Sequence, residues 1–394
     1  MEPISSYIGW VYPNETIFPW SALIVVYPYL TGLVAGAFTV SSLYQVFGFQ
    51  RLKPVAHLAL LTSLCCMIFV PLPLLLHLGH PERAFNSSIT PHWTSAMAMF
   101  GYFAMFYICL LLLETWFAFR PHIVEQAKSR PGVLRYAYKL LTLGSYDTGP
   151  TAMRYDKKWI FYLAVAGIPG AHGLHGYVGF VFGSLKSREW WSSDLMPVIF
   201  LFSAIISGVS LLAILYVVSC KIRKVEIDAE CMKGLAYTIW AFIIAALVLE
   251  GLEFANIVYK GREGVDWIMK FVTGPLLVPY FILQFAIGAI TPFLVLSYMI
   301  WAGTKGKALI TGVTICACLV LLSVFMMRWN VVIGGQEISK TGKGLLDYQP
   351  PLFGAEGIVT ALSIFFAPVA LLVVLIRLLP PWEHGEGPVP TDVS

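Results

Sequence analysis

The chain has 394 residues, of which 58% are hydrophobic and only 12% carry a charge. A soluble domain carries roughly 25% charged residues, so this composition excludes an ordinary water-soluble protein. The formal net charge is only +4, and the basic residues fall in short segments between apolar runs, which argues against a nucleic-acid partner. The lipid bilayer is the predicted environment.

Runs apolar enough to cross a bilayer, about 20 residues for roughly 30 Å of hydrocarbon, recur along the whole chain. We expect an all-α polytopic transmembrane helical bundle of about nine spans, within a range of eight to ten, arranged as two four-helix bundles plus an extra helix. The expected spans lie near 20–48, 54–78, 92–118, 158–182, 194–219, 233–258, 271–302, 307–329 and 354–379.

The spans divide the chain into five predicted segments. These are an extracytoplasmic N-terminal segment (1–19), a first transmembrane bundle (20–182) with a loop at 119–157, a second bundle (194–329), a loop with the last helix (330–379), and a polar C-terminal tail (380–394). The N-terminus lacks the cleavage site of a secretory signal, so we expect the first apolar run to remain in the mature protein.

The distribution of Lys and Arg predicts the orientation. With the N-terminus outside, 17 of the 26 basic residues fall on the cytoplasmic side and 9 outside, as the positive-inside rule requires. The 119–157 loop is then cytoplasmic. We expect a multi-pass protein of the prokaryotic cytoplasmic membrane with an extracytoplasmic N-terminus.

Few ionisable residues lie in or near the spans, and each costs roughly 2.5–3.5 kcal/mol at a helix centre. The second span ends in the sequence HLGHPER, which contains His77 and Arg83, and the fourth contains His172 and His175, three apart and so on one helix face. The sixth span has Glu250 and Glu253, and the third has Glu114 near its inner end. In the predicted orientation all but Glu114 gather in the outer half of the membrane.

A purely structural explanation exists for each of these residues. The glycines around the two histidines also suit plain helix packing, His77 can be an ordinary interfacial residue, and Glu114 can extend to the membrane surface. Glu250 and Glu253 can form a buried hydrogen-bonded pair, and Arg328 is interpreted as an interface anchor.

The chemistry that best suits this set is quinol oxidation or quinone reduction. It needs an apolar slot for the quinone tail, hydrogen-bond donors for two carbonyl oxygens, and a group such as histidine that titrates near neutral pH. Haem would need paired histidines on facing helices at matching depths, which the sequence supports poorly. None of the seven cysteines forms a Cys-x-x-Cys pair, so we expect no metal site, no iron–sulfur cluster and no haem in this chain.

Several motifs resemble the NrfD-type family, the membrane subunits related to that of polysulfide reductase. They are HLGHPER at 77–83, TPHWTSAMAMFGYF at 90–103, LTGLVAGAFTVSSL at 30–43 and FSAIISG at 202–208. The resemblance covers residues 19–220, and within the family the chain is most similar to the DsrP membrane subunits of the DsrMKJOP complexes of sulfur metabolism. Ala96 and Ala98 stand where many members carry proline and a small polar residue.

The resemblance implies a quinone pocket in the first bundle, towards the outer face and next to an extracytoplasmic iron–sulfur subunit. The quinone is menaquinone or ubiquinone, and a cytochrome and other membrane subunits are further expected partners. On this basis the chain exchanges electrons within a respiratory complex and catalyses nothing alone. The implied quinone-binding residues are Trp20, Tyr27, His77, Arg83, His172 and His175.

Two further hypotheses concern the buried carboxylates and the rival function. Glu114, Glu250 and Glu253 are candidate steps of a proton path through the membrane. The alternative is a secondary transporter, which also uses broken helices and buried charges; Pro275 and Pro279 in the seventh span favour it.

Overall fold

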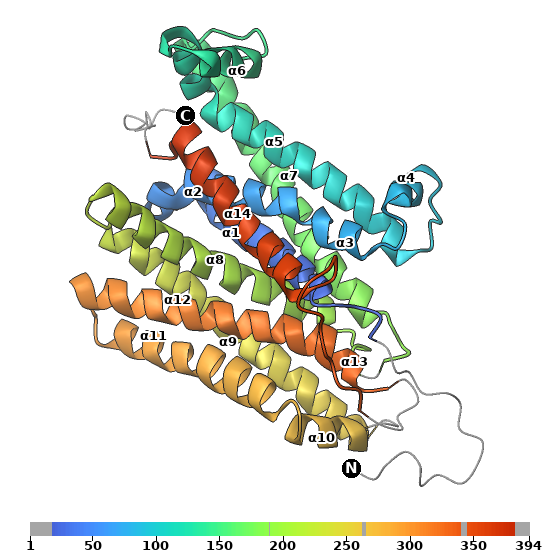
Figure 1. Ribbon diagram of the computed structural model, residues 1–394. Helices are drawn as coiled ribbons and strands as arrows, with labels where there is room; N and C mark the ends of the chain where they lie inside the picture. Colours follow the sequence, from blue (N-terminus) through green and yellow to red (C-terminus); the bar gives the residue numbers. More distant parts are fainter. Residues whose placement is uncertain (1–17, 189, 262–264, 340–344, 383–394) are drawn as a thin grey trace, which may run out of the picture.

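The computed structural model is helical throughout the part of the chain that it describes, residues 18–188, 190–261, 265–339 and 345–382 (Figure 1). Its one β-type contact there is an isolated bridge between Ile338 and Leu345. The predictions for residues 1–17 and 383–394 lie outside the described residues.

The first bundle contains four long helical units. Pro71 divides the second of them into two consecutive helices, because proline lacks the N–H that would continue the helix. The units are α1 (Leu23–Gln45), α2 (Lys53–Phe69) with α3 (Pro71–His77), α5 (Ala96–Ser129) and α7 (Pro150–Gly183). Short helices lie between them: η2 (Gln50–Leu52), η3 (Pro81–Arg83), α4 (Asn86–Ile89) and α6 (Val133–Leu141).

The second bundle also has four units, and a further helix, α14, packs against α1 and α2. Asp228 caps the start of α9 by accepting hydrogen bonds from two backbone amides. The units are α8 (Met196–Arg223), α9 (Ala229–Lys260), the π-helical segment η4 (Leu277–Ile290) with α11 (Thr291–Trp301), and α12 (Gly306–Trp329). The remaining helices are α10 (Val265–Thr273), η5 (Asn330–Gly334), α13 (Gly335–Glu337) and α14 (Ile358–Leu378).

Eight helices among the described residues are long and apolar enough to cross a membrane. This confirms the predicted all-α multi-pass bundle. The predicted fourth span, α7, is 34 residues long but is not among the eight. Its histidines, glycines and Pro169 lower its hydropathy, yet it lies beside α5 and also contacts α1 and α8 (Figure 1).

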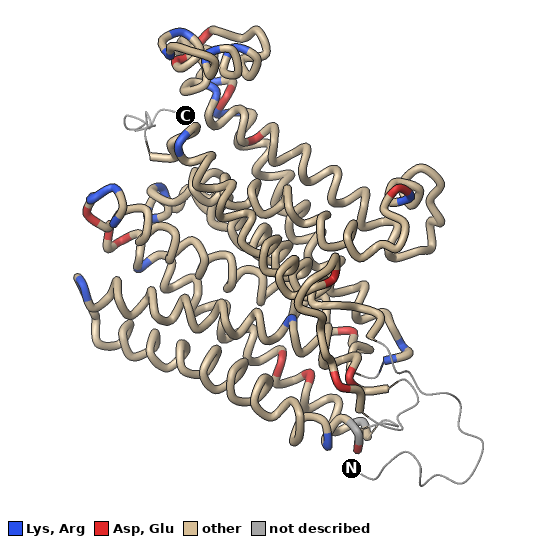
Figure 2. Tube along the Cα trace, in the orientation of Figure 1, with Lys and Arg blue, Asp and Glu red and all other residues tan. Residues whose placement is uncertain are grey.

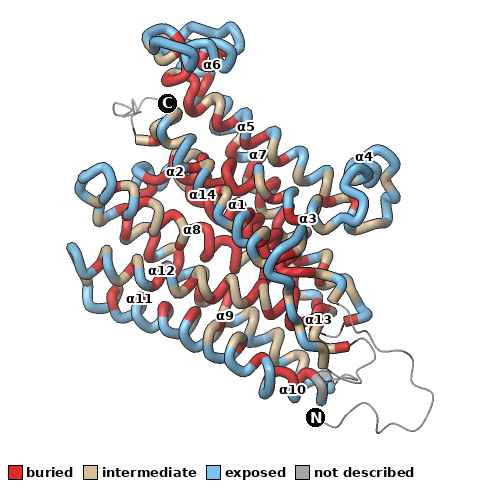
Figure 3. The backbone as a smooth tube through the Cα atoms, viewed as in Figure 1, coloured by how far each residue is buried: buried red, intermediate tan, exposed pale blue. Residues whose placement is uncertain are grey.

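Helix α1 is at the centre of the molecule and contacts both bundles (Figure 3). It crosses α8 at two glycines, where the backbones touch. A Cβ atom on Gly36 would lie 2.1 Å from the carbonyl oxygen of Ala204, and one on Gly208 would lie 2.4 Å from the Cα of Gly36. Only glycine permits this approach, which is a common way for helices to pack in membranes.

The segment predicted as the 119–157 loop is largely helical. α5 continues to Ser129, α6 occupies its middle, and α7 begins at Pro150. Arg120 and Asp156 join the two long helices in a buried ion pair, with 2.6 Å between Arg120 Nη2 and Asp156 Oδ2. Hydropathy marks only the apolar part of a helix, so it does not reveal these polar extensions. Figure 2 shows basic residues concentrated at this end of the molecule.

Candidate functional site

The two ends of the bundle differ in their landmark residues. The Trp20 end carries Trp20 and His77, and the α6 end carries helix α6 (Figure 1). Polar residues occur at the Trp20 end, in the interior between the bundles, and near the α6 end.

Arg328 lies in the interior and is fully buried, with 0% of its surface exposed. Its interpretation as an interface anchor is therefore wrong. Its Nη2 donates to Nε2 of His175 at 3.0 Å and to Oγ of Ser203 at 2.7 Å, and its guanidinium carbon lies 3.8 Å from the centre of the Phe200 ring. Because these contacts come from α7 and α8, Arg328 connects α12 of the second bundle to the first.

The hydrogen bonds around His175 determine where its proton sits. Since Arg328 can only donate, Nε2 of His175 is the acceptor and carries no proton. Nδ1 therefore carries the proton and donates to Oγ1 of Thr31 at 3.1 Å, and Thr31 in turn donates to the carbonyl of Tyr27 at 3.2 Å. The imidazole is thus neutral and held in one tautomer.

His172 also faces α1, but at a different threonine. Its Nδ1 lies 2.8 Å from the carbonyl oxygen of Ile168, and its Nε2 lies 3.2 Å from Oγ1 of Thr39. The two histidines thus occupy one face of α7, and that face packs against α1. Both rings have protein partners on both nitrogens, so in this arrangement neither offers a free nitrogen to a ligand.

A second interior network joins Glu250 to the end of α12. Gln284 donates to Oε2 of Glu250 at 2.7 Å, and Asn330 donates to Oε1 of Gln284 at 2.8 Å. A cavity of about 50 Å³ lies beside them and is also lined by Glu253, whose Oε2 has no partner among the described residues. Such a volume has room for water.

Glu114 lies alone towards the α6 end of the first bundle. It is fully buried, and neither carboxylate oxygen has a hydrogen-bond partner among the described residues. Tyr107, two turns earlier on α5, is also buried, and its hydroxyl lies 3.5 Å from that of Ser63. A carboxyl group without partners in an apolar interior is costly, and Glu114 is not the surface-reaching residue of the structural explanation.

At the Trp20 end the predicted pair His77 and Arg83 is not brought together. Nδ1 of His77 lies 2.9 Å from Oε1 of Glu356, a residue 279 positions later, and the His77 side chain is 22% exposed. Arg83 is 68% exposed, and its Nε lies 3.9 Å from Oε1 of Glu82.

The predicted aromatic residues of the first span belong to two clusters. Trp20 stacks on Trp191 at 4.9 Å and meets Phe182 edge-on, and its backbone exchanges hydrogen bonds with the Gln336 side chain. Tyr27 is buried against α5, edge-on to Phe100.

An apolar slot of about 340 Å³ opens between α1, α12 and α14. Its walls are Ala22, Val25, Val26, Phe325, Trp329, Ile358, Ala361, Leu362 and Phe365. Two polar groups adjoin its Trp20 end. Tyr348 accepts a hydrogen bond from the Ala22 amide at 2.8 Å, and Glu356, the partner of His77, precedes the wall residue Ile358 by two positions.

Burial raises the pKa of Tyr348 above its ordinary value, and the charge of Glu356 adds to that effect. Its hydroxyl therefore keeps its proton. Since the oxygen already accepts from Ala22, the proton is available for donation to another group.

Sequence reasoning missed Arg328, Gln284, Asn330, Tyr348 and Glu356. The first two carry a recognisable signal, a polar residue inside an apolar run. The contacts of the others join distant parts of the chain, which no local pattern reveals. Among the described residues no group of three His, Cys, Asp or Glu side chains is placed to hold a metal ion.

Comparison with known proteins gives relatives along most of the chain. A membrane-complex subunit of the selenate reductase of Mesobacillus selenatarsenatis is 29% identical over 380 residues, which cover 92% of this chain and 85% of the relative. A putative dimethyl sulfoxide reductase membrane subunit of Halobacterium salinarum is 26% identical, covering 72% and 62%. The Hdr-like menaquinol oxidoreductase integral membrane subunit of Archaeoglobus fulgidus is 24% identical, covering 81% and 71%.

The family model of the polysulphide reductase NrfD family matches residues 11–339, which include all four long units of both bundles. The resemblance stated from the motifs is thereby confirmed at the level of the family, and the eight apolar helices agree with it. The chain belongs to the NrfD family of integral membrane proteins.

Proposed function

We propose that this chain is the quinone-reactive membrane subunit of a multisubunit redox complex, and that it exchanges electrons between menaquinone or ubiquinone and an iron–sulfur subunit docked at its Trp20 end. Family membership supports a membrane redox subunit. The relatives named as reductase subunits and as a menaquinol oxidoreductase subunit support partner subunits and a quinone. The likeness to DsrP proteins supports a role in sulfur metabolism.

The observation that carries the proposal is the His77–Glu356 pair beside the apolar slot. The slot volume of about 340 Å³ falls within the range of small-molecule sites, which are mostly apolar with a few polar groups at one end. An isoprenoid tail suits walls made only of apolar side chains. The quinone ring then lies near the hydroxyl of Tyr348 and the His77–Glu356 pair.

These residues suit proton exchange with a quinol. A carboxylate accepts the Nδ1 proton of His77, which leaves Nε2 unprotonated and able to act as a base. No partner of Nε2 is found among the described residues. A bound quinone supplies the two-electron chemistry, while His77 takes or returns a proton and Tyr348 donates a hydrogen bond to a ring oxygen.

The surface next to this site supports a protein partner there. The segment between α3 and α5 exposes large apolar side chains, with Phe85, Ile89 and Trp93 each at least 66% exposed. The charge of Arg83 stands on the same segment. With the basic α6 end in the cytoplasm, this surface is extracytoplasmic, and an iron–sulfur subunit docked on it receives electrons over a short distance.

We further propose that the buried carboxylates move protons. Glu250 with its cavity and Gln284, and Glu114 with Tyr107, are polar groups in the two bundles. The Arg328–His175 contact lies between the bundles. The orphan oxygens of Glu114 and Glu253 support a path that fills with water when it operates.

The direct test replaces His77 by Gln in the assembled complex and follows quinol-dependent reduction of the partner. Loss of a general base lowers turnover by roughly 10²–10⁴-fold. The matched control is His80→Gln, because His80 also pairs with a carboxylate, Glu82 at 3.0 Å, but is 68% exposed. Equal turnover of the two variants would sink the proposed role of His77.

One observation favours the rival transporter function. The seventh span is interrupted by η4, a π-helical segment of 14 residues whose Gln284 contacts Glu250; such segments are frequent at functional sites. A transporter reconstituted alone in vesicles would accumulate a solute without quinone. The proposed redox subunit would be inactive in that assay.

A further inference from the structure

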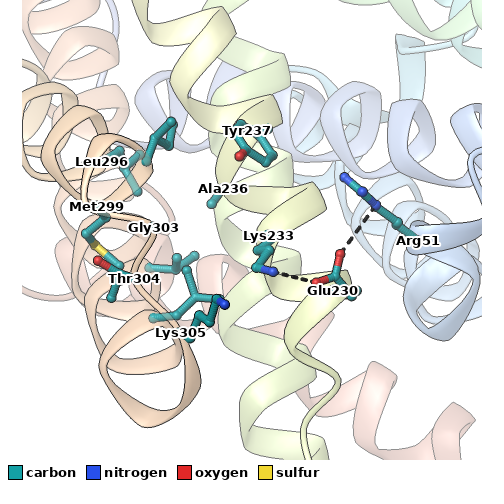
Figure 4. Close-up of a pocket in the computed structure, with 13 residues that line it drawn as sticks. Arg51, Glu230, Lys233, Ala236, Tyr237, Leu296, Met299, Gly303, Thr304 and Lys305 are labelled. Carbon is teal, nitrogen blue, oxygen red and sulfur yellow. Dashed lines mark hydrogen bonds and ion pairs between the residues drawn. The ribbon is translucent and has the colours of Figure 1, made fainter.

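A second cavity, of about 210 Å³, lies at the α6 end of the second bundle. It opens where α9 begins, α11 ends and α12 begins, far from the slot at the Trp20 end (Figures 1 and 4). Its rim is polar and charged, with Arg51, Glu230, Lys233, Thr304 and Lys305.

The rim carries more positive charge than it neutralises. Glu230 pairs with both Lys233 and Arg51, the latter with 3.5 Å between Arg51 Nε and Glu230 Oε2. Figure 4 shows Lys305 reaching from the α11–α12 turn toward Lys233. Three cations against one carboxylate leave an excess of two positive charges, and no ion pair of Lys305 occurs among the described residues.

The backbone adds to this field. α12 begins at Gly306, next to Lys305, and no side chain caps its first amides. The N-terminus of a helix presents unpaired N–H groups and a positive partial charge, which favour an anion.

The floor of the same cavity is apolar. Leu296, Met299, Leu309 and Val313 line it, and each is at most 8% exposed. A cationic rim above an apolar floor, placed where helices enter the bilayer, matches a molecule with an anionic head and a hydrocarbon chain. Basic pockets between transmembrane helices bind anionic lipid head groups in this way.

We propose that this cavity binds an anionic glycerophospholipid, with its phosphate among Arg51, Lys233 and Lys305 and an acyl chain directed to the apolar floor. The lipid would tie the α11–α12 turn to the start of α9. The site is independent of the proposed quinone chemistry, which lies at the opposite end of the molecule.

The test measures binding of phosphatidylglycerol to the purified, delipidated full-length protein by native mass spectrometry. Phosphatidylcholine and inorganic phosphate are the comparison probes. We expect preference for phosphatidylglycerol, and a loss of affinity of about fivefold in Lys305→Gln, the effect of one basic residue at a lipid surface.

Lys307→Gln is the matched control, because Lys307 is exposed two residues away and does not line the cavity. It should leave the affinity unchanged. Equal losses in both variants would show diffuse attraction and overturn the site. Equal binding of phosphatidylcholine would refute selection for an anionic head, and displacement of the lipid by millimolar phosphate would show a site for free anions instead.

Discussion

The crossing of α1 and α8 yields the prediction whose size follows most directly from geometry. In Gly36→Ala the new Cβ would lie 2.1 Å from the Ala204 carbonyl oxygen, whereas real Cβ contacts stay beyond 3.0 Å. The helices must therefore separate by roughly 0.9 Å, and backbone atoms cannot rotate out of the way as a side chain does.

Separating the helices loosens the packing along the most buried helix of the molecule, for which 94% of the apolar window is buried. Overpacking costs about 1–3 kcal/mol and occasionally more; we expect about 3 kcal/mol here, because the contact is backbone to backbone. The midpoint of thermal unfolding in detergent should fall by roughly 5 °C or more.

The matched control is Gly173→Ala on α7, where a Cβ meets nothing within 4 Å. That change should leave stability unchanged or raise it by up to about 1 kcal/mol, since alanine favours helix over glycine. If Gly36→Ala and Gly173→Ala unfold at the same temperature, the close crossing of the two bundles is wrong.

Three further predictions concern single polar residues. Arg120→Gln leaves the Asp156 carboxylate buried without its partner and should cost about 3–5 kcal/mol, seen as faster proteolysis of residues 130–149; exposed Arg154→Gln should not change the rate. Glu114→Gln should keep assembly and electron transfer but abolish proton movement measured in vesicles, whereas Glu125→Gln on the exposed side of α5 should keep both, and normal proton movement in Glu114→Gln would remove that residue from the path. Tyr348→Phe removes the donated hydrogen bond and should lower quinol-dependent turnover about tenfold, an effect of roughly 1.4 kcal/mol; unchanged turnover would place the quinone elsewhere.

The sequence is sufficient to predict the helical membrane fold, because apolar runs of about 20 residues are a strong signal. It is less informative where helices are polar. The ends of α5 and α7 extend beyond the apolar runs and are held by the Arg120–Asp156 pair, so hydropathy alone predicts a loop there. The position of Arg328 near the end of an apolar run indicates the membrane surface, but the bundle buries this residue completely.

The candidate site is predictable only in part for a related reason. Spacing places His172 and His175 on one face of α7, and both do face α1. The partner of His77 could not be predicted, because Glu356 is 279 residues away in a segment without periodicity. Tyr348 and Gln336, from the same part of the chain, reach α1 and the backbone of Trp20 through equally distant contacts.

The most direct test of the proposed function is to purify the complex gently through a tag on this chain and add menaquinol. We expect that an iron–sulfur subunit and bound quinone accompany the chain, and that menaquinol reduces the iron–sulfur centres, as followed by electron paramagnetic resonance. The His77→Gln complex should assemble but leave those centres oxidised, while His80→Gln should match the unmodified complex. Recovery of the chain alone and without quinone, or unchanged reduction in His77→Gln, would contradict the proposed function.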